Sequence, residues 1–176
     1  MAQHNKREAA AAASFLSRRI VAPLTWLGGA ISTLLILGAF GLIVAAVVRR
    51  YVFSAPIRFT DEVAGWALVA AIMFGAAEAY RQGDHISIDL VTARLPDKAR
   101  RAMGVFSDLS VLAFAIAIGR SAWDAVTFAR GFGMYTTGHI VMETWILQTP
   151  LIAGATLLGL AAMTKLAERF TGRRAP

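Results

Sequence analysis

Four long apolar stretches occupy most of this 176-residue chain and limit what it can fold into. They cover roughly residues 24–48, 63–80, 102–119 and 145–166. A helix needs ~20 residues to cross a hydrocarbon core of about 30 Å, and only helices or closed barrels satisfy their backbone groups in lipid. The stretches lack the alternating pattern of barrel strands. We therefore predict an all-α integral membrane protein with four transmembrane helices.

The composition favours a single membrane domain, residues 1–176, with spans at about 24–48, 62–81, 100–125 and 145–168. Hydrophobic residues make up 57% of the chain and charged residues 16%, which leaves no room for a separate soluble domain. The chain has no cysteine, so disulfides, thiolate nucleophiles and Cys-ligated metals are excluded. The first stretch is longer than the apolar part of a signal peptide and ends in Arg49-Arg50, so we expect it to be retained as a span.

The basic residues predict the orientation in the membrane. The net charge of +7 does not indicate a nucleic-acid partner, because these residues flank the apolar stretches as topology signals do. Of the 18 lysines and arginines, 13 lie before the first stretch, between the second and third, and after the fourth, and the other 5 lie on the opposite side. The positive-inside rule therefore places both termini in the cytoplasm.

The segments around the spans carry further signals. Residues 1–20 suit a short interfacial helix on the inner membrane face or, equally, a frayed tail. Residues 85–91 alternate in polarity and are expected to lie at the interface. A third helix from about Asp97 to Arg130 would be ~50 Å long and must tilt or project from the membrane. Thr60 is predicted to cap the second span, and Pro150 falls near the predicted start of the fourth.

Small residues recur at four-residue spacing in three spans, which lets helix backbones approach closely in lipid. The longest stripe is in the second span, which we expect to occupy a crowded central position. The stripes fit either packing within the chain or a seam for a partner subunit. They are Gly41 and Ala45, then Ala67, Ala71, Gly75 and Ala79, and finally Ala155 and Gly159.

Charges inside the spans are few, and none forms a catalytic or ligand-binding pattern. Glu78 and Arg81 are spaced for an i,i+3 pair. Asp108 is expected to reach membrane depth and to contact a neighbouring helix or a basic residue, with a transport role as the alternative. His85 and His139 lie on opposite sides of the membrane, so they cannot share a haem or a metal. With no nucleophile motif, phosphate loop or zinc motif, we expect neither an enzyme nor a cofactor.

Several short motifs occur in a recognisable order. Arg50-Tyr51-Val52-Phe53 follows the first span, Asp61-Glu62 opens the second, and Gly75-Ala76-Ala77 precedes the stretch from Arg81 to Asp89, which reads RQGDHISID. Leu95-Pro96 and a basic cluster come next. Between about Leu24 and Arg101 the chain resembles the small membrane subunit of tripartite ATP-independent periplasmic (TRAP) transporters, the DctQ-like family. It departs from that pattern at Phe59-Thr60, which lacks a tryptophan, and at residues 142–150, which are not proline-rich.

The resemblance implies a scaffold in the bacterial inner membrane for sodium-coupled uptake of a small organic acid. The implied partners are a large membrane subunit, which would carry the sodium and substrate sites, and a periplasmic substrate-binding protein, with membrane lipids around the complex. Two alternatives stay open, a self-contained oligomeric channel or carrier and a membrane redox or quinone-binding protein.

By position, we predict two polar clusters that orient helices or meet these partners. The outer cluster consists of Arg50, Asp61 and Glu62, and the inner cluster of Arg81, His85 and Asp89. The stripe residues Ala67, Ala71 and Gly75 are candidates for the partner interface.

Overall fold

The computed structural model describes residues 17–83 and 96–171, and these residues are almost entirely helical. A short π-helix, η1 (Ser17–Val21), leads into α2 (Ala22–Val52), which is followed by α3 (Thr60–Gln82), α5 (Asp97–Gly131) and α6 (Thr144–Thr171). The four long helices are each apolar and long enough to cross a membrane, which confirms the predicted architecture. The proposed interfacial segments within residues 1–20 and 85–91 lie largely or wholly outside the described residues.

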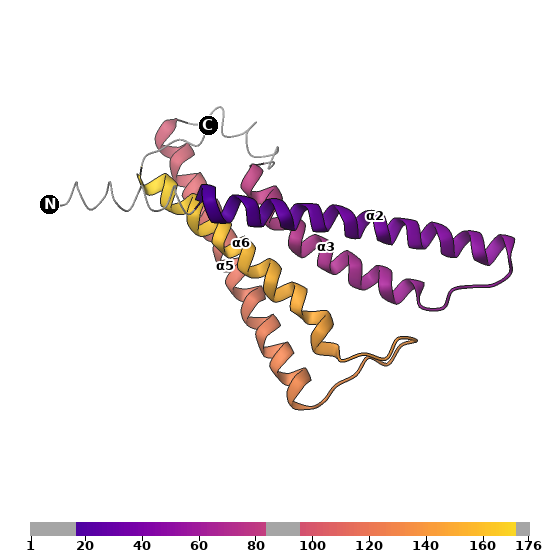
Figure 1. The fold of residues 1–176 in the computed structure, drawn as a ribbon. Helices are drawn as coiled ribbons and strands as arrows, with labels where there is room; N and C mark the ends of the chain where they lie inside the picture. The colour runs from indigo at the N-terminus through magenta and orange to yellow at the C-terminus, as the bar shows by residue number, and fades with distance from the viewer. Residues whose placement is uncertain (1–16, 84–95, 172–176) are drawn as a thin grey trace.

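The four helices form two hairpins that diverge like the arms of a V (Figure 1). One arm pairs α2 with α3, the other pairs α5 with α6, and α3 against α6 joins the two arms. We call the joined end the vertex and the far ends the two turns. The buried apolar cluster includes Val21, Tyr80 and Ala162, so the core lies toward the vertex. The second span therefore has the central position expected for it, because α3 packs against both α2 and α6.

The start of α3 differs in one detail from the sequence prediction. Thr60 does not cap the helix, because its hydroxyl donates to the carbonyl of Ile57 at 3.2 Å and accepts no helix amide. Asp61 and Glu62 do lie in the first turn, where the helix dipole favours carboxylates. At the other end, Gly83 has a φ of 81°, the left-handed conformation that commonly ends a helix.

Two further predictions concern the length of α5 and the position of Pro150 in α6. α5 has 35 residues and is therefore about 52 Å long, as its pattern predicted. Pro150 lies inside α6, beyond the first turn, and not at the start of the helix as we predicted. A proline there leaves the carbonyl of Ile146 without its amide donor. The hydroxyl of Thr149 donates to that carbonyl at 2.6 Å, so the sequence compensates locally.

The α2–α3 contact is built on small residues and one hydrogen bond. A Cβ added to Gly28 would lie 3.1 Å from the carbonyl oxygen of Phe74, so the two backbones are close. Ser32 donates to the carbonyl of Ala71 at 2.7 Å, and a Cβ on Gly75 would reach the Ser32 hydroxyl. The stripe in the second span thus serves packing within the chain at Ala71 and Gly75.

The α3–α6 crossing is the tightest backbone approach between the arms. A Cβ added to Gly154 would lie 2.6 Å from both the Cβ and the carbonyl oxygen of Met73. Along the second arm, Gly159 and Ala155 face small residues of α5 at ordinary contact distances. Gly41 of α2, in contrast, has nothing within 4 Å of an added Cβ.

Gly154→Ala should therefore destabilise the protein, because the added methyl group forces the α3–α6 crossing apart at a cost of about 1–3 kcal/mol. Gly41→Ala is the matched control, and it should be neutral or stabilising by up to about 1 kcal/mol because alanine favours a helix. Thermal unfolding of the purified chain in detergent measures both. Equal midpoints for the two variants would contradict the crossing as described.

Candidate functional site

A polar network lies at the vertex and joins three helices. Asp108 of α5 is only 2% exposed, and its Oδ1 accepts a hydrogen bond from the Tyr80 hydroxyl of α3 at 2.6 Å. Its Oδ2 accepts from Nε of Arg169 in α6, which forms an ion pair with it. Lys165, one turn earlier in α6, donates to the Tyr80 carbonyl at 2.5 Å and stands 4.5 Å from the Tyr80 ring centroid. We call these residues the vertex network.

The vertex network confirms that Asp108 contacts a neighbouring helix and a basic residue, as expected. A buried carboxylate is costly in lipid unless it is paired and hydrogen-bonded, and here both oxygens are engaged. Arg169 also packs over Gly104, where any side chain would collide with its guanidinium. Sequence spacing indicated the depth of Asp108 but not its partners, because Tyr80 and Arg169 are remote in the chain.

A second polar group lies beside the vertex network on α3. Arg81 makes two hydrogen bonds to Glu78, at 2.9 and 2.6 Å, so the predicted i,i+3 pair is present. Gln82 donates to the same carboxylate at 2.5 Å. His85 and Asp89, which were grouped with Arg81 as an inner cluster, lie outside the described residues.

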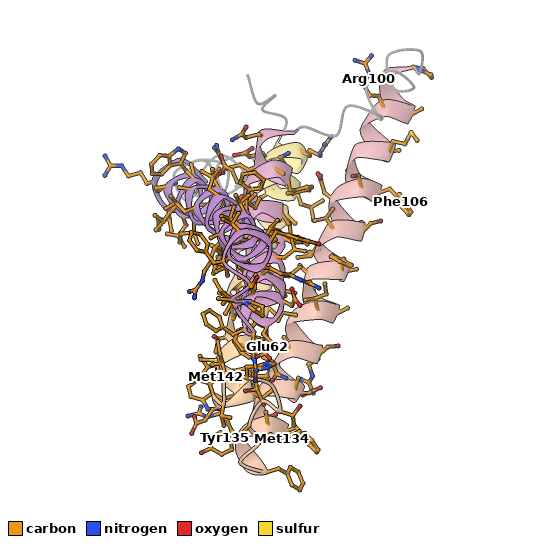
Figure 2. The ribbon with its side chains drawn as sticks, turned by 90° about the vertical axis from the view of Figure 1, so that its right-hand side faces the viewer. Glu62, Arg100, Phe106, Met134, Tyr135 and Met142 are labelled. Atoms are coloured by element: carbon orange, nitrogen blue, oxygen red, sulfur yellow. The ribbon has the colours of Figure 1, made fainter. Side chains whose placement is uncertain are left out.

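A third polar contact holds the two arms together near their turns. The Glu62 carboxylate accepts the backbone amides of His139 at 2.7 Å and Ile140 at 3.2 Å, and His139 Nδ1 is 3.0 Å from it. Gly138 leaves space for the carboxylate, since a Cβ there would overlap it. We call this contact the turn clasp. In Figure 2 the labelled Glu62 of α3 lies near Met142 of the loop, while Met134 and Tyr135, which follow the end of α5, lie farther from it.

The loop that carries the turn clasp is held in shape by hydrogen bonds within the loop. Tyr135 and Glu143 form an antiparallel bridge, and Thr144 donates to the Met134 carbonyl at 3.0 Å. The hydroxyl of Thr136 donates to the Ile140 carbonyl at 2.6 Å. Nothing in the sequence indicated this pairing or the reach of the loop toward Glu62.

The residues predicted for the outer cluster are not joined to one another in the described part of the chain. Arg50 stands 5.8 Å from the ring of its neighbour Tyr51 and pairs with neither carboxylate. Asp61 is exposed, and its side chain has no bonding partner within residues 17–83 and 96–171. Glu62 alone makes a contact between elements. Of the stripe residues, Ala71 is buried within the chain, while Ala67 and Gly75 are partly exposed.

The described residues show no cluster of metal ligands and almost no unpaired buried polar side chain. No group of three or more histidine, aspartate or glutamate side chains there could bind a metal ion. The buried polar side chains are bonded to protein, and within the described range only Oε1 of Gln148 is buried without a partner. The arrangement can position helices and present surfaces.

Glu62→Ala should release the loop that carries the turn clasp. A hydrogen bond to a charged group contributes about 1.5–3 kcal/mol, so amide exchange at His139 and Ile140 should accelerate by about tenfold or more. Hydrogen exchange followed by mass spectrometry measures this directly. Asp61→Ala removes the neighbouring, unbonded carboxylate and should leave exchange in the loop unchanged. Unaltered exchange in both variants would rule out the clasp.

Asp108→Asn should lower the thermal stability, because it leaves Arg169 without its buried counter-ion. Asp108 is buried but the Arg169 side chain is 41% exposed, so the expected loss is that of a hydrogen bond to a charged group, about 1.5–3 kcal/mol, which corresponds to a fall of at least about 3 °C in Tm. Asp124→Asn on the same helix is the control. The ion pair between Asp124 and Arg120 is exposed and 3.8 Å long, so removing it should lower the free energy of unfolding by less than about 1 kcal/mol. A similar fall in Tm for both variants would argue against the vertex network.

Comparison with known proteins identifies the family. Residues 39–172 match the family model described as the DctQ component of tripartite ATP-independent periplasmic transporters. The chain is 34% identical over 86 residues to the sialic acid TRAP transporter permease protein SiaT of Haemophilus influenzae strain 86-028NP. The matched stretch covers 49% of this chain and 13% of that protein. It is 24% identical over 82 residues to a putative TRAP transporter small permease protein of Haemophilus influenzae strain Rd, covering 47% of this chain and 51% of the relative. The chain belongs to the DctQ family, whose members are components of TRAP transporters and not enzymes.

Proposed function

We propose that this chain is the small permease subunit of a TRAP transporter and acts as its static scaffold. In this proposal it assembles with a large membrane subunit, which carries the sodium and substrate sites and performs transport. The substrate is a small organic acid, delivered by a periplasmic substrate-binding protein. The family match supports the assembly, and the name of the SiaT relative supports an acidic substrate for that protein.

The observation that carries the scaffold role is the satisfaction of charge inside the membrane helices. A conduit for an acid or an ion needs polar groups that a solute can reach. Here Asp108 is engaged by Tyr80 and Arg169, and Glu78 by Arg81 and Gln82. No route of unpaired charged groups crosses the described helices. The alternatives of a self-contained carrier or a redox protein find no such support.

The helices also retain much apolar surface for partners. Only 28% of the residues in the most apolar part of α3 and of α6 are buried within the chain, and the values for α2 and α5 are 6% and 11%. In a membrane this surface meets either lipid or the helices of another subunit. A four-helix chain with such exposure is suited to extend the framework of a larger subunit.

The proposed orientation puts the vertex on the cytoplasmic side of the inner membrane and the two turns on the periplasmic side. Thirteen of the 18 basic residues then lie inside, in agreement with the positive-inside rule. The loop held by the turn clasp would face the periplasm, where it could contact the substrate-binding protein. Glu62 would thus fix the shape of a docking surface.

Reconstitution into proteoliposomes tests the proposal. The chain alone should give no solute flux, whereas the chain with its large subunit and binding protein should give uptake of an organic acid that depends on a sodium gradient. Sialic acid is the first substrate to try, since it is named for one relative. Flux through vesicles that contain only this chain would overturn the scaffold role.

Charge reversal at the turn clasp refines the test. Glu62→Lys should reduce uptake or recovery of the complex, because the lysine repels His139 in its protonated form and cannot accept the loop amides. Asp61→Lys is the matched control, because it introduces the same charge one residue away, at an exposed side chain that makes no bond in the described region. Full uptake and full complex recovery by Glu62→Lys would show that the clasp has no part in transport.

A further inference from the structure

A cavity of about 210 Å³ lies beside the turn between α5 and α6. An engineered cavity of about 150 Å³ in another protein is large enough for benzene, so this one has room for a small polar group. Its lining combines one cation, one anion and an indole with small or apolar residues. The lining residues are Ala129, Arg130, Gly133, Met134, Glu143 and Trp145. We call it the turn cavity.

Arg130 brings an unused set of donors to the turn cavity. Its guanidinium stacks over the Trp145 ring, 4.6 Å from the centroid, which limits its movement. Among the described residues, no carboxylate forms an ion pair with it. A guanidinium held by its face on an aromatic ring keeps its N–H edge for a ligand, and the geometry of that edge matches the oxygens of a phosphate.

Glu143 brings the opposite charge to the same cavity. Its Oε2 accepts a hydrogen bond from the Trp145 indole at 2.5 Å, while Oε1 has no bonding partner within the described residues. Trp145 therefore holds both charged groups, one by its face and one by its N–H. Because Arg130 and Glu143 do not pair with each other, the cavity presents a separated positive and negative charge. The complementary ligand is a zwitterion.

Two exposed aromatic side chains lie in the last turn of α5 and directly after it. The rings of Phe128 and Phe132 are 4.5 Å apart between centroids, and the two residues are 56% and 72% exposed. Trp145 marks the start of a membrane-spanning helix, and tryptophan commonly lies at the level of lipid headgroups. A ligand in the cavity would therefore have hydrocarbon contacts within reach.

We propose that the turn cavity binds the zwitterionic headgroup of a phospholipid, with the phosphate on Arg130 and a primary ammonium on Glu143. The acyl chains would then extend into the surrounding bilayer. Phosphatidylethanolamine has this chemistry. Phosphatidylglycerol has the phosphate but no cation for Glu143, and the quaternary ammonium of phosphatidylcholine cannot donate a hydrogen bond. The purified chain alone should therefore bind this lipid, without the large subunit and without transport.

Native mass spectrometry of the purified chain in detergent tests the site, with each of the three phospholipids titrated separately. The wild-type chain should bind phosphatidylethanolamine about tenfold more tightly than either of the other two lipids. Arg130→Gln should weaken that binding by about tenfold or more. Glu143→Gln keeps an oxygen acceptor for the Trp145 indole and should abolish the preference over phosphatidylglycerol. Arg120→Gln, an exposed arginine on the same helix, should bind like wild type.

Three results would overturn the assignment. They are equal binding of all three lipids by the wild-type chain, unchanged binding by both Arg130→Gln and Glu143→Gln, and an equal loss in Arg120→Gln. Glycerophosphoethanolamine separates the two possible sources of the headgroup. It should compete with the lipid only at far higher concentration, and competition at equal concentration would assign the cavity to a free zwitterion. If the Arg130 variant proves unstable, the change of preference in Glu143→Gln still decides the question.

Discussion

The crossing of α3 and α6 at Met73 and Gly154 is the contact on which the rest of the structure depends. Helices in lipid gain no hydrophobic energy by pairing, so they associate where their backbones can approach closely. Gly154 allows that approach, since even a methyl group there would meet the backbone of Met73. Without this contact the α2–α3 and α5–α6 hairpins would share little, because α2 and α5 lie on the outside of the V (Figure 1).

Close packing alone does not fix how the helices are rotated, and the vertex network supplies that information. Tyr80, Asp108 and Arg169 come from three different helices, and the side chains of Tyr80 and Arg169 converge on the Asp108 carboxylate. Rotating any one of these helices would bury an unpaired charge, which is costly in lipid. The same residues that neutralise Asp108 therefore also set the register of α3, α5 and α6. The charge acts as a structural tie and is not available to a solute.

Local features of the structure followed from the sequence, whereas contacts between helices did not. Hydropathy predicted four helices, and spacing predicted the Glu78–Arg81 pair. Such pairs depend only on the pitch of one helix. The Glu62–His139 contact spans 77 positions, and it depends on how two hairpins cross. The pattern gave no information on that angle, so the predicted cluster of Arg50, Asp61 and Glu62 grouped residues that have separate surroundings.

Thr60 and Pro150 show a related limit on what residue preferences predict. Both residue types have strong positional preferences at helix starts, and both occupy other roles here. Thr60 bonds back to the preceding loop, and Pro150 is accommodated because Thr149 replaces the missing donor. Statistical preference describes the average helix end. At a single position a hydrogen bond from a neighbouring hydroxyl can offset that preference, since one hydrogen bond contributes about 1 kcal/mol.

The contacts between the arms also explain why a splayed shape can be rigid. The α3–α6 crossing joins the arms partway along their length, the vertex network ties them on one side of it, and the turn clasp ties them on the other. Opening or closing the V about the crossing would have to break one of the two polar ties. A frame tied on both sides of its pivot resists scissor motion, which is the mechanical property that the proposed scaffold role requires. The apolar faces of α2 and α5 can then contact lipid or partner helices without altering the frame itself.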